Sequence, residues 1–125
     1  MAVAYKSSGV TSAFTLQCVD VSDIENTGLN DFVSSSSTVY SVDIDNSAGG
    51  SMTIVYVKIY DNKSPTYGTT DPDIMFTVAA NSRQVWTIAQ GVSMSNGVSL
   101  MASKADGPDA TAAPDTQVDV SFVMT

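Results

Sequence analysis

The sequence predicts an all-β protein, folded as a single β-sandwich or jelly-roll-like domain of about seven to eight antiparallel strands. Apolar and polar residues alternate with a period of two in many short segments, whereas a helical period of 3.6 residues is hard to find. Strong helix formers are scarce, since Glu25 is the only glutamate and the chain holds three leucines. Val, Thr, Tyr and Ile, which suit the pleated surface of a sheet, are used instead.

Seven segments carry the strand pattern, and they define the expected elements: residues 13–19, 38–45, 52–60, 74–78, 84–89, 98–102 and 117–125. The first segment is expected to turn Phe14, Leu16 and Cys18 toward one face. The segment 52–60 is apolar on both sides except for Lys58. This pattern is typical of a strand covered on both faces, either by the chain itself or in part by a neighbouring subunit.

The second segment alternates most cleanly, and Tyr40, Val42 and Ile44 are expected to point the same way. The turn-rich residues 46–50 that follow favour a hairpin between this segment and the next one. Residues 22–37 are ambiguous, because one helical turn capped by a serine is an alternative to the favoured loop. Further loops are expected at residues 61–70, 91–97 and 105–115, the last of them exposed.

Composition restricts the partners that the chain can bind. The 13 acidic and 5 basic residues give a net charge of −8, which repels phosphate backbones and anionic lipids, so neither nucleic acid nor a membrane is expected as a partner. Residues 1–125 are expected to form one domain, with residues 1–12 as a candidate N-terminal docking arm. The N-terminal residues lack the hydrophobic region of a secretory signal. Cys18 is the only cysteine, and a buried, inert thiol is the expected state.

Catalytic and metal chemistry find little support in the residue types. Histidine is absent, which removes Ser-His-Asp and Cys-His catalysis and, with a single cysteine, a structural zinc site. We therefore expect no enzyme, no catalytic residue, no cofactor and no metal. Two alternatives stay open: acid–base chemistry by a carboxylate pair, and an irregular Ca²⁺ site. The carboxylate pairs are Asp43 with Asp45 and Asp71 with Asp73, and the Ca²⁺ site would lie around Asp71, Asp73 or the loop 106–109.

The residues expected at an interface lie mainly in the polar loops. Tyr67 lies in a loop beside Pro65 and Gly68, where burial by the chain itself is difficult, and exposed loop tyrosines favour intermolecular contacts. The expected interface residues are Tyr67, Pro65, Asp106, Pro108 and Tyr5. Trp86 is expected to belong to the core.

Residues 38–125 also contain an ordered set of short features. In sequence order these are the alternating residues 39–46, the run Val-Tyr-Val-Lys-Ile-Tyr-Asp at 55–61, the loop Pro-Thr-Tyr-Gly-Thr-Thr-Asp-Pro at 65–72, Asn81-Ser82, and the glycine- and serine-rich segment 91–99. An Ala/Asp/Pro loop and a final Val-alternating strand complete the set. As an ordered set it resembles a group of small tailed-phage virion proteins. The first 35 residues match less clearly and are expected to carry docking specificity.

The resemblance implies a β-sandwich that decorates or connects a phage particle and has no catalytic residues. The first hypothesis is a capsid decoration (cement) protein on the outer capsid surface of a virion assembled in the host cytoplasm. Its partner is expected to be the major capsid protein, and a homotrimer is the favoured oligomer. The alternative is a receptor- or glycan-binding module of a tail fibre, spike or head–tail component, with Trp86, Tyr67 and loop carboxylates as a sugar platform. An Asp-dependent glycan hydrolase ranks third.

Overall fold

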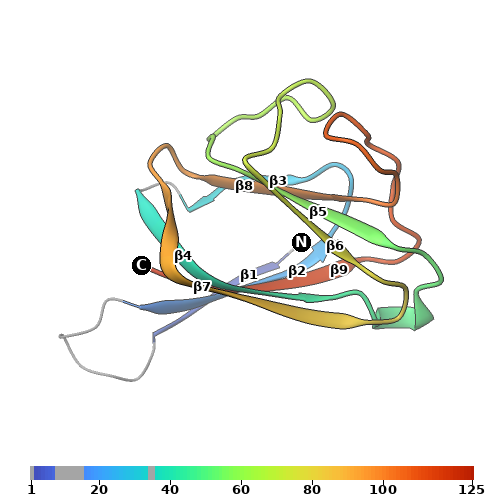
Figure 1. Ribbon diagram of the computed structural model, residues 1–125, viewed down its shortest axis with the longest axis horizontal. Helices are drawn as coiled ribbons and strands as arrows, with labels where there is room; N and C mark the ends of the chain where they lie inside the picture. Colours follow the sequence, from blue (N-terminus) through green and yellow to red (C-terminus); the bar gives the residue numbers. More distant parts are fainter. Residues whose placement is uncertain (1, 8–15, 34–35) are drawn as a thin grey trace.

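The computed structural model describes residues 2–7, 16–33 and 36–125, which form two facing antiparallel sheets (Figure 1). No α-helix occurs in this part of the chain, and the predicted all-β sandwich is confirmed. The elements are β1 (Ala2–Ser7), β2 (Gln17–Ile24), β3 (Leu29–Val33), β4 (Ser37–Asp45), the 3-10 turn η1 (Ala48–Gly50), β5 (Val55–Tyr60), β6 (Ile74–Val78), β7 (Arg83–Met94), β8 (Val98–Ser103) and β9 (Val118–Met124).

The strand order is that of a jelly roll. The five-stranded sheet runs β1-β2-β9-β4-β7, and the four-stranded sheet runs β3-β8-β5-β6. The first half of the chain pairs with the second half in reverse order: β2 with β9, β3 with β8, β4 with β7, and β5 with β6. In a jelly roll the two halves of the chain pair in this way and wrap together around one core. β1 adds an edge strand beside β2.

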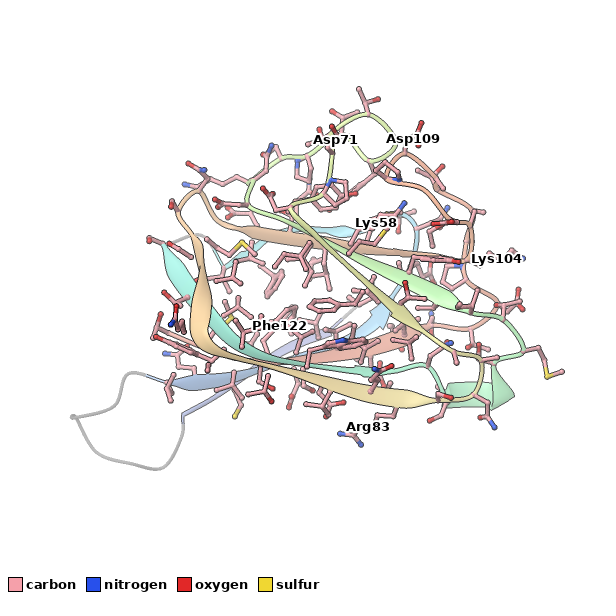
Figure 2. All side chains as sticks on the ribbon, viewed as in Figure 1. Lys58, Asp71, Arg83, Lys104, Asp109 and Phe122 are labelled. Carbon is pink, nitrogen blue, oxygen red and sulfur yellow. The ribbon has the colours of Figure 1, made fainter. Side chains whose placement is uncertain are left out.

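The core lies between the two sheets and follows the two-residue alternation. Every second residue of β9 points inward, so that Val118, Val120, Phe122 and Met124 are buried, as the sequence predicts for the final strand. The ring of Phe122 lies 5.3 Å from that of Phe32, which belongs to the opposite sheet. Figure 2 shows Phe122 in the middle of this layer.

Bulges shift the inward face in two strands, and both shifts correct the prediction. In β2 the residues that point inward are Val19, Val21 and, beyond an irregularity at 21–24, Ile24. Cys18 is half-buried instead of fully buried, because it precedes Val19 and so lies on the opposite face of the strand. Phe14 lies outside the described residues. In β4 the residue Tyr40 is the extra one between two paired positions, so it is half-buried.

The connection at residues 46–50 is a crossover and not a hairpin turn. It contains η1, and it joins β4 of the five-stranded sheet to β5 of the four-stranded sheet. Turn residues show that the chain changes direction, but they do not select the strand that will be its neighbour. The predicted hairpin is therefore wrong, although the predicted turn is present.

Two further segments differ from the prediction. Residues 29–33 form β3, within the stretch for which a loop was favoured, and β7 continues past Gly91 to Met94. The positive φ of 73° at Gly91 accommodates an irregular register with β4, since a Cβ there would lie 2.3 Å from Thr38 Cγ2. The described residues thus hold nine strands, two more than the segments expected from the sequence.

The core predicts a large difference between two chemically identical substitutions. Met94 is 0% exposed and Met52 is 84% exposed. Met94→Ala is expected to lower the free energy of unfolding by about 2–5 kcal/mol, because it removes buried methylenes and leaves a cavity. Met52→Ala, the control, is expected to change it by no more than about 0.5 kcal/mol. Urea denaturation measures both, and equal effects would contradict the described core.

Candidate functional site

The outer face of the four-stranded sheet is covered by two loops, residues 61–73 and 104–117, here called the loop layer (Figure 1). Side chains that point away from the core are nevertheless buried beneath it. On the central strands these are Lys58, Tyr60, Ser99, Met101 and Ser103, each 0% exposed. The sequence prediction that the segment around Lys58 is covered on both faces is confirmed for β5, and the chain itself supplies the cover.

Tyr67 anchors the first loop of the layer to the sheet. Its ring lies edge-on to Tyr60 with 5.4 Å between centroids, and its hydroxyl donates to Asn30 Oδ1 at 2.6 Å and to the Leu100 carbonyl oxygen at 3.3 Å. Burial raises the pKa of Tyr67 well above its ordinary value. Tyr67 is thus half-buried and Pro65 is buried, so the expectation that this tyrosine is an exposed loop residue is wrong.

Lys58 holds the second loop from below. Its Nζ donates to the carbonyl oxygens of Pro108 at 3.3 Å and Ala110 at 2.5 Å. Burial lowers the pKa of Lys58, while the charges of Asp109 and Asp106 act in the opposite direction. Figure 2 shows Lys58 beneath the loops that carry Asp71 and Asp109. A buried cation bonded to two backbone carbonyls fixes the loop, because moving the loop away would leave the ammonium group without these partners.

Further polar contacts connect the layer to the rest of the sandwich. Ser99 Oγ donates to the Asn62 carbonyl oxygen at 2.6 Å and accepts from the Asp31 amide at 2.9 Å. Asn26 Nδ2 donates to the Thr111 carbonyl oxygen at 2.9 Å. Both loops are therefore held at several points, and their tips form a fixed surface. The exposed residues at these tips include Asp71, Asp106, Pro108, Asp109 and Thr111.

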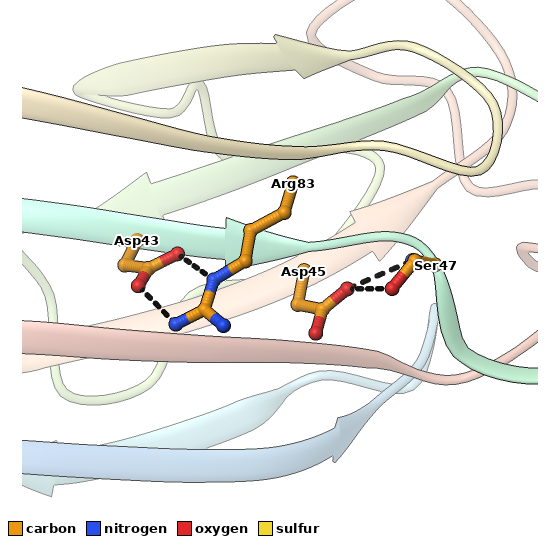
Figure 3. Close-up of polar contacts among 4 residues, drawn as sticks. All are labelled: Asp43, Asp45, Ser47 and Arg83. Carbon is orange, nitrogen blue, oxygen red and sulfur yellow. Dashed lines mark hydrogen bonds and ion pairs between the residues drawn. The ribbon is translucent and has the colours of Figure 1, made fainter.

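The carboxylate pair Asp43 and Asp45 lies on the opposite side of the molecule, on the outer face of the five-stranded sheet (Figure 3). Asp43 binds the Arg83 guanidinium through both oxygens, at 2.9 and 2.6 Å. Asp45 accepts from the amide and the hydroxyl of Ser47 at 2.9 and 2.5 Å, and these hydrogen bonds lower its pKa. A general acid of a glycosidase needs a raised pKa, so the environment of Asp45 is opposite to that requirement.

The other sequence-derived candidates are also separate from one another. Trp86 stacks against Phe76 with 4.5 Å between ring centroids at the side of the core, whereas Tyr67 lies in the loop layer, so the two do not form a shared sugar platform. Tyr5 lies in β1, paired with Val19 at the edge of the five-stranded sheet, away from the loop layer. Of the candidate docking arm, residues 2–7 form this paired strand, and residues 1 and 8–12 lie outside the described residues.

Cation binding has no assembled ligand set in the described part of the chain. Among these residues, no three Asp, Glu, Cys or His side chains come together in a way that could hold a metal ion. Asp73 Oδ2 accepts from the Asp61 amide at 2.7 Å, and Asp106 Oδ1 accepts from the Gly107 amide at 2.8 Å. The first contact joins the two ends of the loop 61–73, and the second lies within the turn at residues 106 and 107.

The layer predicts that two glycines in the same backbone conformation respond differently to alanine. Gly28 and Gly50 have φ of 69° and 68°, but a Cβ on Gly28 would lie 2.3 Å from Tyr67 Cζ, and a Cβ on Gly50 would meet nothing within 4 Å. Gly50→Ala is expected to destabilise by about 1–2 kcal/mol through its φ alone. Gly28→Ala adds about 1–3 kcal/mol, because the Tyr67 ring must move. Urea denaturation tests the difference; equal losses would show that Tyr67 does not fill this space.

The tyrosines predict a loss of stability at alkaline pH. Burial, and secondarily the charge of Asp71, raises the pKa of Tyr60 from 10.0 to about 12. A raised pKa contributes stability that is complete below pH 10 and is lost as the pH rises through 12. Lys58 has the opposite sign, since its lowered pKa gives a contribution that is complete above 10.5. Net destabilisation is therefore expected above that pH. Urea denaturation at increasing pH tests this, and Tyr67→Phe should reduce the decline. An unchanged decline would contradict the role of Tyr67.

Comparison with known proteins adds no relative from which a function could be transferred. No family model, curated protein or solved structure matches the chain. In the part of the chain that the structure describes, no helix is long and apolar enough to cross a membrane. Functional inference therefore depends on the surfaces described above.

Proposed function

We propose that this protein is a structural component of a tailed-phage virion, a capsid decoration (cement) protein that binds the outer capsid surface through its loop layer. The observation that carries the proposal is the immobilisation of two long loops on a rigid jelly roll by Tyr67 and Lys58. Loops of this length are commonly binding elements. Fixing them before binding reduces the conformational entropy that is lost on association.

The composition of the layer supports a protein partner. Its exposed tips carry Asp71, Asp106 and Asp109 beside Pro108, in a chain of net charge −8. This arrangement disfavours phosphate backbones and anionic lipids and is compatible with a basic or amide-rich protein surface. The partner proposed here is the major capsid protein, and the place of assembly is the host cytoplasm.

Assignment to a virion also draws on the fold and on the motif order of residues 38–125. Jelly rolls are found in viral capsid proteins, lectins and cupins, so the fold is compatible with several functions. The resemblance to small virion proteins favours the first of these classes. A protein that strengthens a shell needs stable shape and contact area, and a doubly covered sheet provides both.

A receptor- or glycan-binding module of a tail fibre or spike is the second candidate. It shares the fold class, since lectin domains are also jelly rolls. The separation of Trp86 from Tyr67 removes the aromatic platform first considered for it. Such a module would have to bind sugar through polar groups of the loops.

Copy number on purified particles distinguishes the two candidates. Quantitative mass spectrometry of particles produced by the genome that encodes the chain is expected to find hundreds of copies, in proportion to the major capsid protein. A few tens of copies would indicate a fibre or spike. Absence from the particles would refute both candidates.

The loop layer should also determine binding to particles that lack the protein. Asp109→Lys, at the tip of the layer, is expected to reduce binding at least about tenfold, which corresponds to about 1.4 kcal/mol. Asp119→Lys makes the same charge change on the opposite face and serves as the control. Co-sedimentation with the particles measures both, and a loss confined to Asp119→Lys would place the contact on the five-stranded sheet.

A further inference from the structure

One side of the sandwich exposes two edge strands that follow each other in the chain. β6 is an edge of the four-stranded sheet and β7 is an edge of the five-stranded sheet. They are joined by a short turn at residues 79–82, and Phe76 stacks on Trp86 between them. Among the described strands, β7 pairs with β4 alone, so its other edge is open to a further strand.

This side differs in charge from the rest of the molecule. Residues 74–94 hold one charged residue, Arg83, although the chain has 5 basic and 13 acidic residues. The charge of Arg83 is balanced by its bidentate contact with Asp43. Two copies, each with a net charge of −8, repel one another through their acidic faces, and the β6–β7 side is where that repulsion is weakest.

The first half of β7 is regular enough to pair with a further β-strand along its open edge. From Arg83 to Thr87 it keeps a regular register with β4, residue by residue from Asp45 to Ser41. Only beyond Thr87 does the register shift. Natural edge strands are usually protected by charged side chains, Pro, bulges or shortness. The segment 83–87 has no Pro and no bulge, and its one charged residue, Arg83, is paired with Asp43. Val85 is 55% exposed there, and Thr87 is also exposed.

We propose that β7 is a self-association edge: residues 83–87 pair antiparallel with the same residues of a second copy around a two-fold axis. The two five-stranded sheets then form one continuous sheet across both sandwiches. A second copy is the occupant that fits, because an identical strand has the same twist and an antiparallel pair of identical strands is self-complementary. The exposed Val85 then pairs with Val85 of the other copy, and Thr87 lies opposite Arg83.

The small number of paired residues limits the affinity of this association. Five paired residues form a contact smaller than the roughly 1,200–2,000 Å² of a stable interface, so the dimer is expected to be weak and reversible in solution. This inference does not depend on the capsid proposal. It differs from the trimer expected from the sequence, since a two-fold axis generates pairs.

Sedimentation equilibrium over a range of concentrations tests the pairing. The average mass is expected to rise from 13.1 kDa toward twice that value as the concentration increases. Thr87→Lys, which places a charge on the open edge, is expected to stay monomeric over the same range. Thr69→Lys, an identical change in the exposed part of the loop layer, is expected to associate like the unmodified protein.

A second edge variant, Val85→Lys, keeps the test decisive if Thr87→Lys does not fold. Circular dichroism with thermal unfolding identifies which variants are folded. A mass that stays at the monomer value at every concentration would overturn the proposal. So would a trimer, or a dimer that persists in a folded edge variant. Particle binding is unaffected by these outcomes, so failure here is distinguishable from failure of the decoration proposal.

Discussion

The structure depends on the burial of the four-stranded sheet on both of its faces. One face packs on the core between the sheets, and the other is sealed by the loop layer. The second seal is partly polar: the Lys58 ammonium group and the Tyr67 hydroxyl end on backbone carbonyl or amide oxygens. Because groups buried in this way are costly without their partners, the loops and the sheet stabilise each other. Long connections that would otherwise be mobile thereby become part of the rigid body.

Charge is distributed so that different surfaces suit different contacts. The outer face of the five-stranded sheet carries Asp43 and Asp45, each engaged by a neighbouring residue, and the loop tips carry further carboxylates. The side formed by β6 and β7 is almost free of charge. The contacts proposed for the loop tips and for the neutral edge therefore involve separate surfaces. The jelly roll places these surfaces on different sides of one small domain.

Local pattern predicted the strands well where a segment alternates without interruption, as in β9 and β6. It failed where a bulge changes which residues point inward, as at Tyr40, and where a strand contains polar residues. β3 is such a strand, since Asn30 and Asp31 interrupt it and Asp31 has a φ of 52°. Local pattern could not predict which strands pair with each other. β4 and β5, for example, are consecutive in sequence but belong to different sheets.

Of the candidate site, the sequence showed only residues that break the local pattern, and not the contacts that these residues make. Lys58 was visible as the single charged residue in an apolar run, but its acceptors lie 50 and 52 residues further along the chain. Tyr67 was expected to be exposed because a loop rarely buries its own aromatic ring. The space that receives it is created by Gly28, which a Cβ would close, and no local signal connects these two positions.

The place of β9 in the five-stranded sheet has a consequence for biosynthesis. β9 lies between β2 and β4, and its pairing joins Gln17 to Met124. While the ribosome is still making β8, this sheet lacks its middle strand, and β2 and β4 both have an unfilled side. Closure of the sandwich is therefore a late event that links distant parts of the chain, which slows folding and exposes the nascent protein to premature strand exchange with neighbouring chains.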